Sequence, residues 1–397
     1  MKVLLINSVC GIRSTGRICT DLAQQFEKEG HEVKIAYGRV DEVPEQFQKY
    51  AVRIGNDMDL KLHALRTRVL DEHGFGSKRA TKEFLMWAEA YNPDLVWLHN
   101  IHGYYINIEM LFNWIKSRPN MQIKWTLHDC WTFTGHCSHF IAVGCDQWKK
   151  QCVQCCQKNE YPASKIKDNC KNNYIRKRKA FTGVKHLSLI TPSKWLADLT
   201  RESFLKEYPV EVVYNTVDTK VFKPTDSDFR KQYKLENKTI VLGVASTWTE
   251  RKGIYDFIKL SKMLSNDYVI VLVGLTEESL KQFGTVQTKE TDFKYNLEEM
   301  EKQIKRYEKG VAIPQDINVL YKEIVGEYFE KFPYESASII CIPRTNNIIE
   351  LAEIYTAADV FANPTYEDNY PTVNLEAKAC GTKVITYDTG GCIETIH

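Results

Sequence analysis

The stretch VFANPTYEDNYPTVNLEAKACGTKVITY, residues 360–387, holds a complete strand–helix–strand unit. Val360–Ala362 is a short apolar run, Pro371–Cys380 is typical of a helix that a proline opens, and Lys383–Tyr387 is again typical of a strand. Consecutive strands joined by a helix pack in parallel through a right-handed crossover. The stretch therefore predicts an α/β fold built on a parallel sheet.

Short apolar runs alternate with amphipathic stretches in two series along the chain. The first series predicts strands at Lys2–Ile6, Glu32–Tyr37, Leu95–Leu98, Ile123–Leu127 and His186–Ile190. The second predicts strands at Thr239–Val244, Tyr268–Val273, Ile339–Ile342, Val360–Ala362 and Lys383–Tyr387. The pattern pauses near Asn215–Pro224, and a single hydrophobic core stops growing at roughly 250–300 residues. The 397 residues therefore predict two doubly wound domains, 1–217 and 218–397.

One segment of the second domain, about 277–338, departs from this alternation. It is rich in Lys, Glu, Tyr and Gln, with helical spacing at Leu297, Met300, Ile304 and Tyr307. It lies between two strands that a short connection is expected to join, since such loops usually run about 2–6 residues. We therefore expect an inserted, mostly helical excursion, which is a lid, a contact surface or neutral decoration.

Charge and hydropathy restrict the class of partner. Lys plus Arg is 53 and Asp plus Glu is 51, so the net charge of +2 does not favour nucleic acid. The basic run IRKRKAF (Ile175–Phe181) is typical of a solvated helix face, and contact with an anionic membrane surface is the alternative. No segment reaches the ~20 apolar residues that span a bilayer, and MKVLLINSVC is typical of a first strand rather than of a signal peptide. We expect a cytoplasmic protein.

Six of the twelve cysteines lie between Cys130 and Cys156. A zinc ribbon needs two CxxC pairs, and only Cys152 and Cys155 form one. Buried reduced thiols are therefore favoured over a zinc site. The weak zinc candidates are Cys137, Cys145, Cys152 and Cys155.

Glycine and histidine follow three expected strands of the first domain. GIRSTGRI (Gly11–Ile18) is expected to be a loop whose glycines, including Gly16, let the backbone approach a ligand, and a plain tight turn is the alternative. HNIHGYY (His99–Tyr105) and TLHD (Thr126–Asp129) follow two later strands. Ligands of open α/β sheets bind outside the carboxyl ends of strands, which predicts one shared crevice. Its candidates are His99, His102, His128 and Asp129.

Two polar segments follow strands of the second domain. WTERKG (Trp248–Gly253) places Arg251 and Lys252 at a helix start, which the helix dipole disfavours unless an anion binds there. Asp368 precedes the next helix and Glu376 lies inside it, so the two acids can contact different parts of one ligand, such as a sugar and a ribose. A solvated basic pair, a capping acid and a buried acid are the structural alternatives.

Together these residues resemble the retaining GT-B glycosyltransferases of family four, of the bacterial surface and capsular polysaccharide type. The matching pieces run in order along the chain: STGRI, IAYGR, LHNIHGYYIN, WTLHDCWTFTGHC, TPSKWL, RKG and YEDNYPTVNLEA. The resemblance implies two Rossmann-like domains facing a central cleft, with the acceptor on the N-terminal domain and the donor on the C-terminal one. Relatives continue with further helices, so it also implies that the chain ending at His397 is truncated.

The resemblance implies roles for single residues. Glu376 would hydrogen-bond the donor ribose, and Asp368, where the family usually has Glu, would face the hydroxyls of the donor sugar. Lys252, with Arg251, would neutralise the diphosphate, and His128 would contact the sugar near the reacting carbon. The other donor-side residues are Gly16, Asn369, Tyr370, Pro371 and Thr372.

The implied activity is transfer of a hexose-type sugar from a nucleoside-diphosphate sugar to a saccharide or lipid-linked acceptor in surface polysaccharide biosynthesis. The anomeric configuration would be retained, and no cofactor or metal would be obligatory. Position 247 is Thr where the family usually has Arg, so either Arg251 substitutes or the diphosphate is held differently. Two alternatives stay open: a GT-B-like sugar-nucleotide epimerase, and a catalytically impaired, zinc-binding assembly protein.

Overall fold

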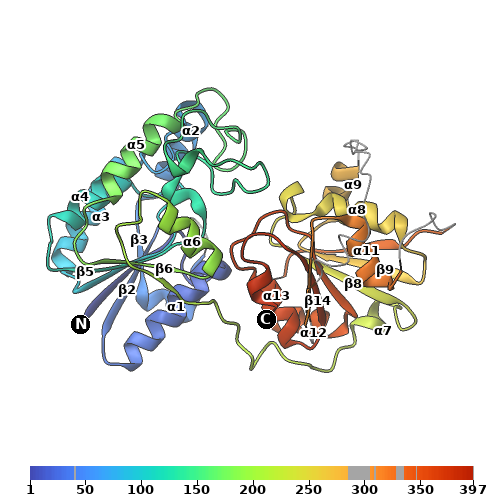
Figure 1. The fold of residues 1–397 in the computed structure, drawn as a ribbon. Helices are drawn as coiled ribbons and strands as arrows, with labels where there is room; N and C mark the ends of the chain where they lie inside the picture. The colour runs from blue at the N-terminus through green and yellow to red at the C-terminus, as the bar shows by residue number, and fades with distance from the viewer. Residues whose placement is uncertain (40–41, 285–304, 308–309, 328–334, 346, 397) are drawn as a thin grey trace. The chain divides into compact units, whose positions relative to one another are not determined.

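The computed structural model describes residues 1–39, 42–284, 305–307, 310–327, 335–345 and 347–396 (Figure 1). The chain divides into two compact units, Met1–Tyr214 and Asn215–His397. Each unit holds a seven-stranded sheet, and helices cover both of its faces (Figure 1). The predicted α/β fold class is therefore confirmed for both units.

The strand order of the first sheet is β3-β2-β1-β4-β5-β6-β7, with all neighbours parallel. Its strands are β1 (Lys2–Ile6), β2 (Glu32–Tyr37), β3 (Ala51–Arg53), β4 (Leu95–Leu98), β5 (Gln122–Thr126), β6 (Leu187–Thr191) and β7 (Val210–Val212). The chain winds from β1 to one edge and then returns to β4 on the other side of β1. The strand order therefore reverses between β1 and β4, as in a Rossmann fold.

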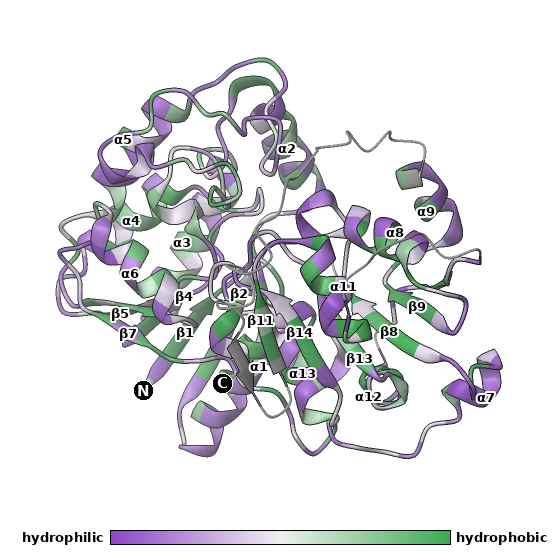
Figure 2. Ribbon diagram, turned by 45° about the vertical axis from the view of Figure 1, so that its right-hand side comes forward, coloured by the Kyte–Doolittle hydropathy of each residue, from purple (hydrophilic) through white to green (hydrophobic). Residues whose placement is uncertain are grey.

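Two apolar layers enclose this sheet because its side chains alternate between faces. Val3 and Leu5 point to the layer that contains Ala23 of α1 (Arg13–Lys28). Leu4 and Ile6 point to a larger layer on the opposite face. That layer is formed by α3 (Lys78–Tyr91), α4 (Ile108–Lys116) and α5 (Cys170–Phe181). Figure 2 shows the hydrophobic strands between helices with hydrophilic outer faces. The other α-helices in the described part of this unit are α2 (Asp57–Leu70) and α6 (Lys194–Glu202).

The strand order of the second sheet is β10-β11-β14-β13-β8-β9-β12. Its strands are β8 (Thr239–Val244), β9 (Tyr268–Val273), β10 (Lys305–Tyr307), β11 (Gly310–Ile313), β12 (Ser338–Ile342), β13 (Val360–Asn363) and β14 (Lys383–Tyr387). Its described helices are α7 (Phe229–Tyr233), α8 (Ile254–Met263), α9 (Glu277–Gly284), α11 (Ile317–Val325), α12 (Ile348–Ala357) and α13 (Thr372–Ala379). Here the order reverses between β8 and β13.

The segment 277–338 holds the helices α9 and α11, and it also holds two strands that were not predicted. It contributes β11, which pairs in parallel with β14 at the far side of the sheet, and β10, which pairs antiparallel with β11. It returns to β12, a parallel neighbour of β9, and parallel neighbours need a crossover of about a dozen residues or more. A long segment between β9 and β12 is therefore what the parallel pairing of these two strands requires. Of the predicted helical positions, Tyr307 ends β10, whereas Leu297, Met300 and Ile304 lie outside the described residues.

The first helix also differs from its prediction. It begins at Arg13, so most of the expected loop GIRSTGRI is helical. No side chain caps the start of this helix, so the sequence lacks the N-cap residue by which a helix start is usually recognised. A Cβ atom at Gly16 would lie 3.0 Å from Val9 Cγ2 and 3.2 Å from Gly11 N, so Gly16 lets α1 pack against the loop after β1. This close packing outweighs the low helix propensity of glycine.

A buried carboxylate fastens the irregular segment 127–169 to the rest of the first unit. Asp71 ends α2, and its carboxylate accepts hydrogen bonds from His136 Nδ1 at 2.5 Å and from Asn169 N at 2.8 Å. The side chains of Asp71 and His136 are fully buried. Burial alone would lower the pKa of His136, but the hydrogen bond and charge of Asp71 outweigh burial and raise it. The pair thus joins two segments that are far apart in sequence.

We predict that Asp71→Asn destabilises the first unit by about 3 kcal/mol, because it removes one partner of a buried ion pair. Asp57→Asn is the control, since Asp57 forms a half-exposed pair with Arg53, and it should cost less than about 0.5 kcal/mol. Denaturant unfolding of the full chain, followed by circular dichroism, measures both. Equal costs for the two variants would contradict a structural role for Asp71.

Candidate functional site

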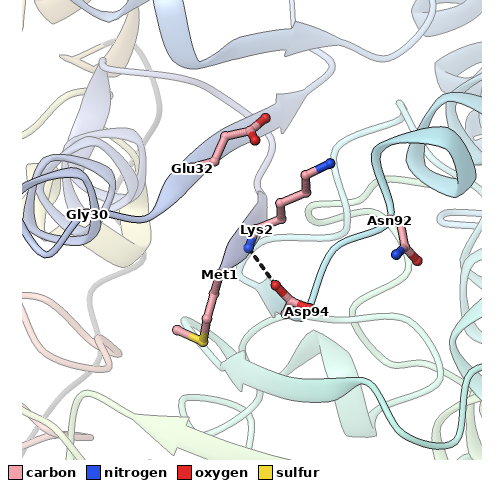
Figure 3. A pocket seen from close by; sticks show the side chains of 6 residues that line it. All are labelled: Met1, Lys2, Gly30, Glu32, Asn92 and Asp94. Atoms are coloured by element: carbon pink, nitrogen blue, oxygen red, sulfur yellow. Dashed lines mark hydrogen bonds between the residues drawn. The ribbon is translucent and has the colours of Figure 1, made fainter.

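A pocket of about 450 Å³ opens at the amino ends of β1, β2 and β4 (Figure 3). Its lining residues are Met1, Lys2, Gly30, Glu32, Asn92 and Asp94. The carboxylate of Asp94 accepts a 2.7 Å hydrogen bond from Lys2 N, and thereby joins the starts of two strands. Ligands of such sheets bind at the opposite, carboxyl edge. We therefore assign the pocket no role in the candidate site.

At the carboxyl edge of the first sheet, Asn7 joins the two loops that flank the strand-order reversal. Its side chain donates to Val9 O at 2.8 Å and accepts from Asn100 N at 3.2 Å. The loop after β1 and the loop after β4 are thus held together where the fold favours ligand binding. Asn7 was missed in the sequence, although a polar residue directly after a buried strand is a recognisable signal.

His99 and His128 meet beside this reversal. His99 Nδ1 lies 3.1 Å from His128 Nε2, and the two rings stack with centroids 5.4 Å apart. His99 also stacks on Trp97, and its carbonyl accepts a hydrogen bond from Trp125 Nε1 at 3.1 Å. Burial lowers the pKa of His128 to about 4 and that of His99 well below its usual value. Both imidazoles are therefore neutral at pH 7 and suit contact with hydroxyl groups.

His102 and Asp129 form the second pair at this edge. His102 Nε2 lies 2.9 Å from Asp129 Oδ2, and Asp129 Oδ1 accepts a 2.9 Å hydrogen bond from Trp131 N. Burial alone would raise the pKa of Asp129, but the charge and hydrogen bond of His102 outweigh burial and hold it well below its usual value. The structure thus brings the four candidates of this edge together as two pairs: the acceptor-side candidate His99 with the catalytic candidate His128, and the acceptor-side candidates His102 and Asp129 with each other.

The cysteine candidates form no metal centre in the described part of the chain, where no group of three or more His, Cys, Asp or Glu side chains is placed to hold an ion. Cys137 and Cys152 are buried and belong to the main apolar layer of the first unit. Cys145 and Cys155 pack against that layer, and Cys152 Sγ accepts a hydrogen bond from Gly135 N at 3.3 Å. The arrangement favours packed thiols.

In the second unit, the loops after β8 and β13 touch through their backbones. Tyr366 N donates to Arg251 O at 2.8 Å. Gly253 has a φ of +74°, and a Cβ atom there would lie 2.3 Å from Pro364 O. Only glycine fits this position, because both its left-handed backbone and its close approach exclude a side chain. The two loops that flank the reversal therefore meet directly.

Both expected cations point into this junction. Arg251 Nη1 donates to Glu367 O at 2.6 Å, and Lys252 Nζ forms an ion pair with Asp368 Oδ2. About a quarter of the Lys252 side chain and a fifth of the Asp368 side chain remain exposed. The sequence placed these residues on separate motifs, and the structure brings them into direct contact.

The turn before α13 supplies backbone groups beside these cations. Asn369, Tyr370 and Pro371 are buried, whereas Thr372 is half-buried. Pro371 is the N-cap residue and α13 starts at Thr372, so the predicted first helical position is one residue early. Pro371 has no N–H group, which leaves the amides of Asn369, Tyr370 and Thr372 as candidate donors for an anion.

Glu376 lies on the buried side of α13. Only 4% of the residue is exposed, and its Oε2 accepts a 3.0 Å hydrogen bond from Tyr355 OH of α12. Asn374, two residues earlier, receives a 2.8 Å hydrogen bond from Asn363 Nδ2 at the end of β13. Tyr355 and Asn363 were missed in the sequence, because a tyrosine or asparagine at an element end carries no signal of its own.

We predict that Gly253→Ala destabilises the second unit by about 3 kcal/mol, because backbone strain and the clash with Pro364 O add together. The matched control is Gly326→Ala, with a φ of +91° and no atom within 4 Å of the added Cβ, which should cost only about 1 kcal/mol. Denaturant unfolding measures both. A cost for Gly253→Ala no larger than that of the control would contradict the close loop contact.

We predict that the first unit loses stability as the pH falls from about 6.5 to about 4. Burial lowers the pKa of four imidazoles, those of His63, His73, His99 and His128. In this pH window they are protonated in the unfolded chain and stay neutral in the folded chain, so protonation favours unfolding. His63 and His128 each contribute at most about 1.4 kcal/mol per pH unit in this window, and His73 and His99 act in the same direction. The raised pKa of His136 acts in the opposite direction, since its contribution is present below about 6.5 and lost as the pH rises.

His63→Gln tests this linkage, because the amide oxygen can replace Nε2 as the acceptor for Gly74 N and Gly76 N without titrating. Unfolding free energies between pH 4.5 and 6.5 should fall less steeply in the variant, by about 1.4 kcal/mol per pH unit. An unchanged slope would show that His63 is not held neutral.

Two curated relatives share part of the chain. The putative colanic acid biosynthesis glycosyl transferase WcaC of Escherichia coli is 32% identical over 27% of this chain and 27% of its own length. The N,N'-diacetylbacillosaminyl-diphospho-undecaprenol alpha-1,3-N-acetylgalactosaminyltransferase of Campylobacter jejuni is 38% identical over 50% of this chain and 42% of its own length. The aligned regions thus span less than half of these relatives.

The fold of this chain is also similar to that of proteins whose structures have been solved. Anabaena HepE in complex with UDP superposes with a TM-score of 0.56 at 14% identity, covering 99% of this chain and 82% of HepE. The model of Glycosyl transferases group 1 matches residues 336–397. The model of Glycosyltransferase Family 4 matches residues 15–221, more than half of the chain. With two α/β units of the GT-B type and this match, the chain belongs to Glycosyltransferase Family 4.

Proposed function

We propose that this chain transfers a sugar from a nucleoside-diphosphate sugar to a saccharide or lipid-linked acceptor in surface polysaccharide biosynthesis. The observation that supports it most is the junction of the loops after β8 and β13. There Arg251, Lys252 and the turn before α13 converge at the strand-order reversal of the second unit. Cations and backbone amides at one place are what a diphosphate requires.

The chemical task is to stabilise a departing diphosphate. As the bond between the anomeric carbon and the diphosphate oxygen breaks, negative charge collects on the diphosphate and positive charge on the sugar ring. Lys252 and Arg251 are proposed to stabilise that negative charge, with the amides of Asn369, Tyr370 and Thr372. Backbone contacts hold these groups in place beforehand, so little reorganisation accompanies the reaction.

The acids are proposed to orient the rest of the donor. Glu376 accepts from the ribose hydroxyls, and the Tyr355 hydroxyl fixes the position of its carboxylate. Asp368 accepts from hydroxyls of the donor sugar. In the first unit, the neutral His128 contacts the sugar near the reacting carbon, while His102 and Asp129 face the acceptor.

Two comparisons support the substrate classes. HepE was crystallised with UDP, and the name of the Campylobacter relative specifies an undecaprenol-linked acceptor. We extend the class of each substrate to this chain: a nucleoside-diphosphate sugar as donor and a saccharide or lipid-linked saccharide as acceptor. We also propose that the anomeric configuration is retained, as the signature from Asp368 to Glu376 implies.

The test is a panel of nucleotide sugars, with nucleoside diphosphate release measured with and without lipid-linked saccharides. We predict that Lys252→Ala lowers kcat/KM by about 100-fold, because it removes a cation that acts on the leaving group. Glu376→Gln should weaken donor binding by about tenfold or more. Lys262→Ala, an exposed lysine at the other end of α8, is the control and should match the unaltered chain.

Two outcomes would contradict the proposal. One is that no nucleotide sugar raises the melting temperature or releases a nucleoside diphosphate. The other is that Lys252→Ala behaves like Lys262→Ala. Donor conversion that ignores every acceptor would instead indicate an epimerase.

A further inference from the structure

Helix α2 exposes apolar side chains and buries polar ones. Met58, Leu62 and Leu65 are 63%, 58% and 58% exposed, whereas His63 and Thr67 are buried. At about 100° per residue, the three apolar side chains lie within roughly 60° of one another, on the side away from His63 and Thr67. This is the reverse of the amphipathic pattern by which a surface helix packs on a core.

The inward polar face of α2 has a structural explanation. His63 Nε2 accepts hydrogen bonds from Gly74 N at 3.1 Å and Gly76 N at 3.2 Å, and Thr67 Oγ1 donates to His63 O. The two bonds from Gly74 N and Gly76 N fix the turn between α2 and α3, and the Thr67 bond lies within α2. The outward apolar stripe takes no part in them, so the fold of the first unit does not explain it.

The irregular segment 127–169 extends this stripe. Lys165 N donates to Arg68 O at 2.8 Å and Lys167 N donates to Val69 O at 3.2 Å, which places the segment beside the end of α2. Both views show the irregular segment next to α2 (Figures 1 and 2). Ile166, between the two bonded residues, is 69% exposed. Two separate parts of the chain thus meet at the end of α2, and both expose apolar side chains.

Cations border the stripe, whereas its acids are already paired. Asp57 pairs with Arg53, Asp59 lies 3.8 Å from Arg79, and Glu72 pairs with Arg66. The bordering cations form no ion pair with any acid that the structure describes, and all four are exposed. They are Lys61, Arg68, Lys165 and Lys167.

We propose that this α2 surface, formed by Met58, Leu62, Leu65 and Ile166 with their four bordering cations, docks on an anionic lipid bilayer. An apolar stripe with lysine and arginine at its borders is the pattern of helices that lie in the headgroup region. Each cation near an anionic leaflet adds attraction. Four side chains offer much less area than the ~800 Å² per partner of a stable protein interface, which disfavours a second copy of the chain.

Such docking would hold the first unit at the surface where a lipid-linked acceptor resides. No helix in the described part of the chain is long and apolar enough to cross a membrane, so surface contact is the mode that this face supports. The inference does not rest on the transferase proposal, because vesicle binding needs neither donor nor acceptor.

Sedimentation of the full chain with vesicles tests the inference. The chain should bind vesicles of mixed phosphatidylglycerol and phosphatidylcholine, and binding should weaken as NaCl rises from about 0.1 M to about 1 M. Leu62→Glu should weaken binding at least about tenfold, and Lys61→Ala about fivefold. Both residues are exposed, so circular dichroism and the melting temperature should not change.

Met86→Glu is the matched control, because Met86 is 62% exposed on α3, outside the stripe. It should bind vesicles like the unaltered chain. Equal binding by Leu62→Glu and Met86→Glu, or equal binding to phosphatidylcholine alone, would overturn the proposal. So would a dimer in analytical ultracentrifugation that Leu62→Glu dissociates, since the face would then be a protein interface.

Discussion

The hydrogen bond from Tyr366 N to Arg251 O holds together the two loops that follow β8 and β13. These loops leave the sheet in opposite directions, because the strand order reverses between their strands. Without that contact, Arg251 and Lys252 would belong to one loop, and Asp368 with the turn before α13 to another. Gly253 permits the contact, since any side chain there would meet Pro364 O. The candidate donor site is therefore a consequence of backbone packing at a reversal of the sheet.

Much of the fold could be predicted from alternation in the sequence. The bounds of β1, β2, β4, β8, β9 and β14 are as predicted, because each is a buried apolar run between polar turns. The short strands β3 and β7 escaped detection, since three residues carry too little pattern. Helix α2 was missed for a different reason. It buries His63 and Thr67, so no apolar stripe marks an inward face. The partners of β11 could not be inferred either, because its pairing with β14 joins distant segments.

The site was less accessible to sequence reasoning than the fold. Strand-end motifs correctly placed His99, His102, His128 and Asp129 at one edge, because the carboxyl ends of parallel strands share an edge. Their division into two pairs depends on side-chain geometry that no spacing shows. The same is true of the contact between Lys252 and Asp368, which lie 116 positions apart. Tyr355 is recognised as part of the candidate site only from its hydrogen bond to Glu376. The functional roles of these residues stay predictions.

The ion pair between Lys252 and Asp368 has a consequence for the order of events during binding. An ammonium group that is already paired with a carboxylate attracts a second anion less strongly. A diphosphate that draws Lys252 toward itself would compete with Asp368 and leave that acid to turn to a hydroxyl-bearing partner. A nucleoside diphosphate that lacks the transferred sugar would leave Asp368 beside a second negative group without a hydroxyl partner from that sugar. The exchange of partners would thus favour the intact nucleotide sugar over the free nucleoside diphosphate.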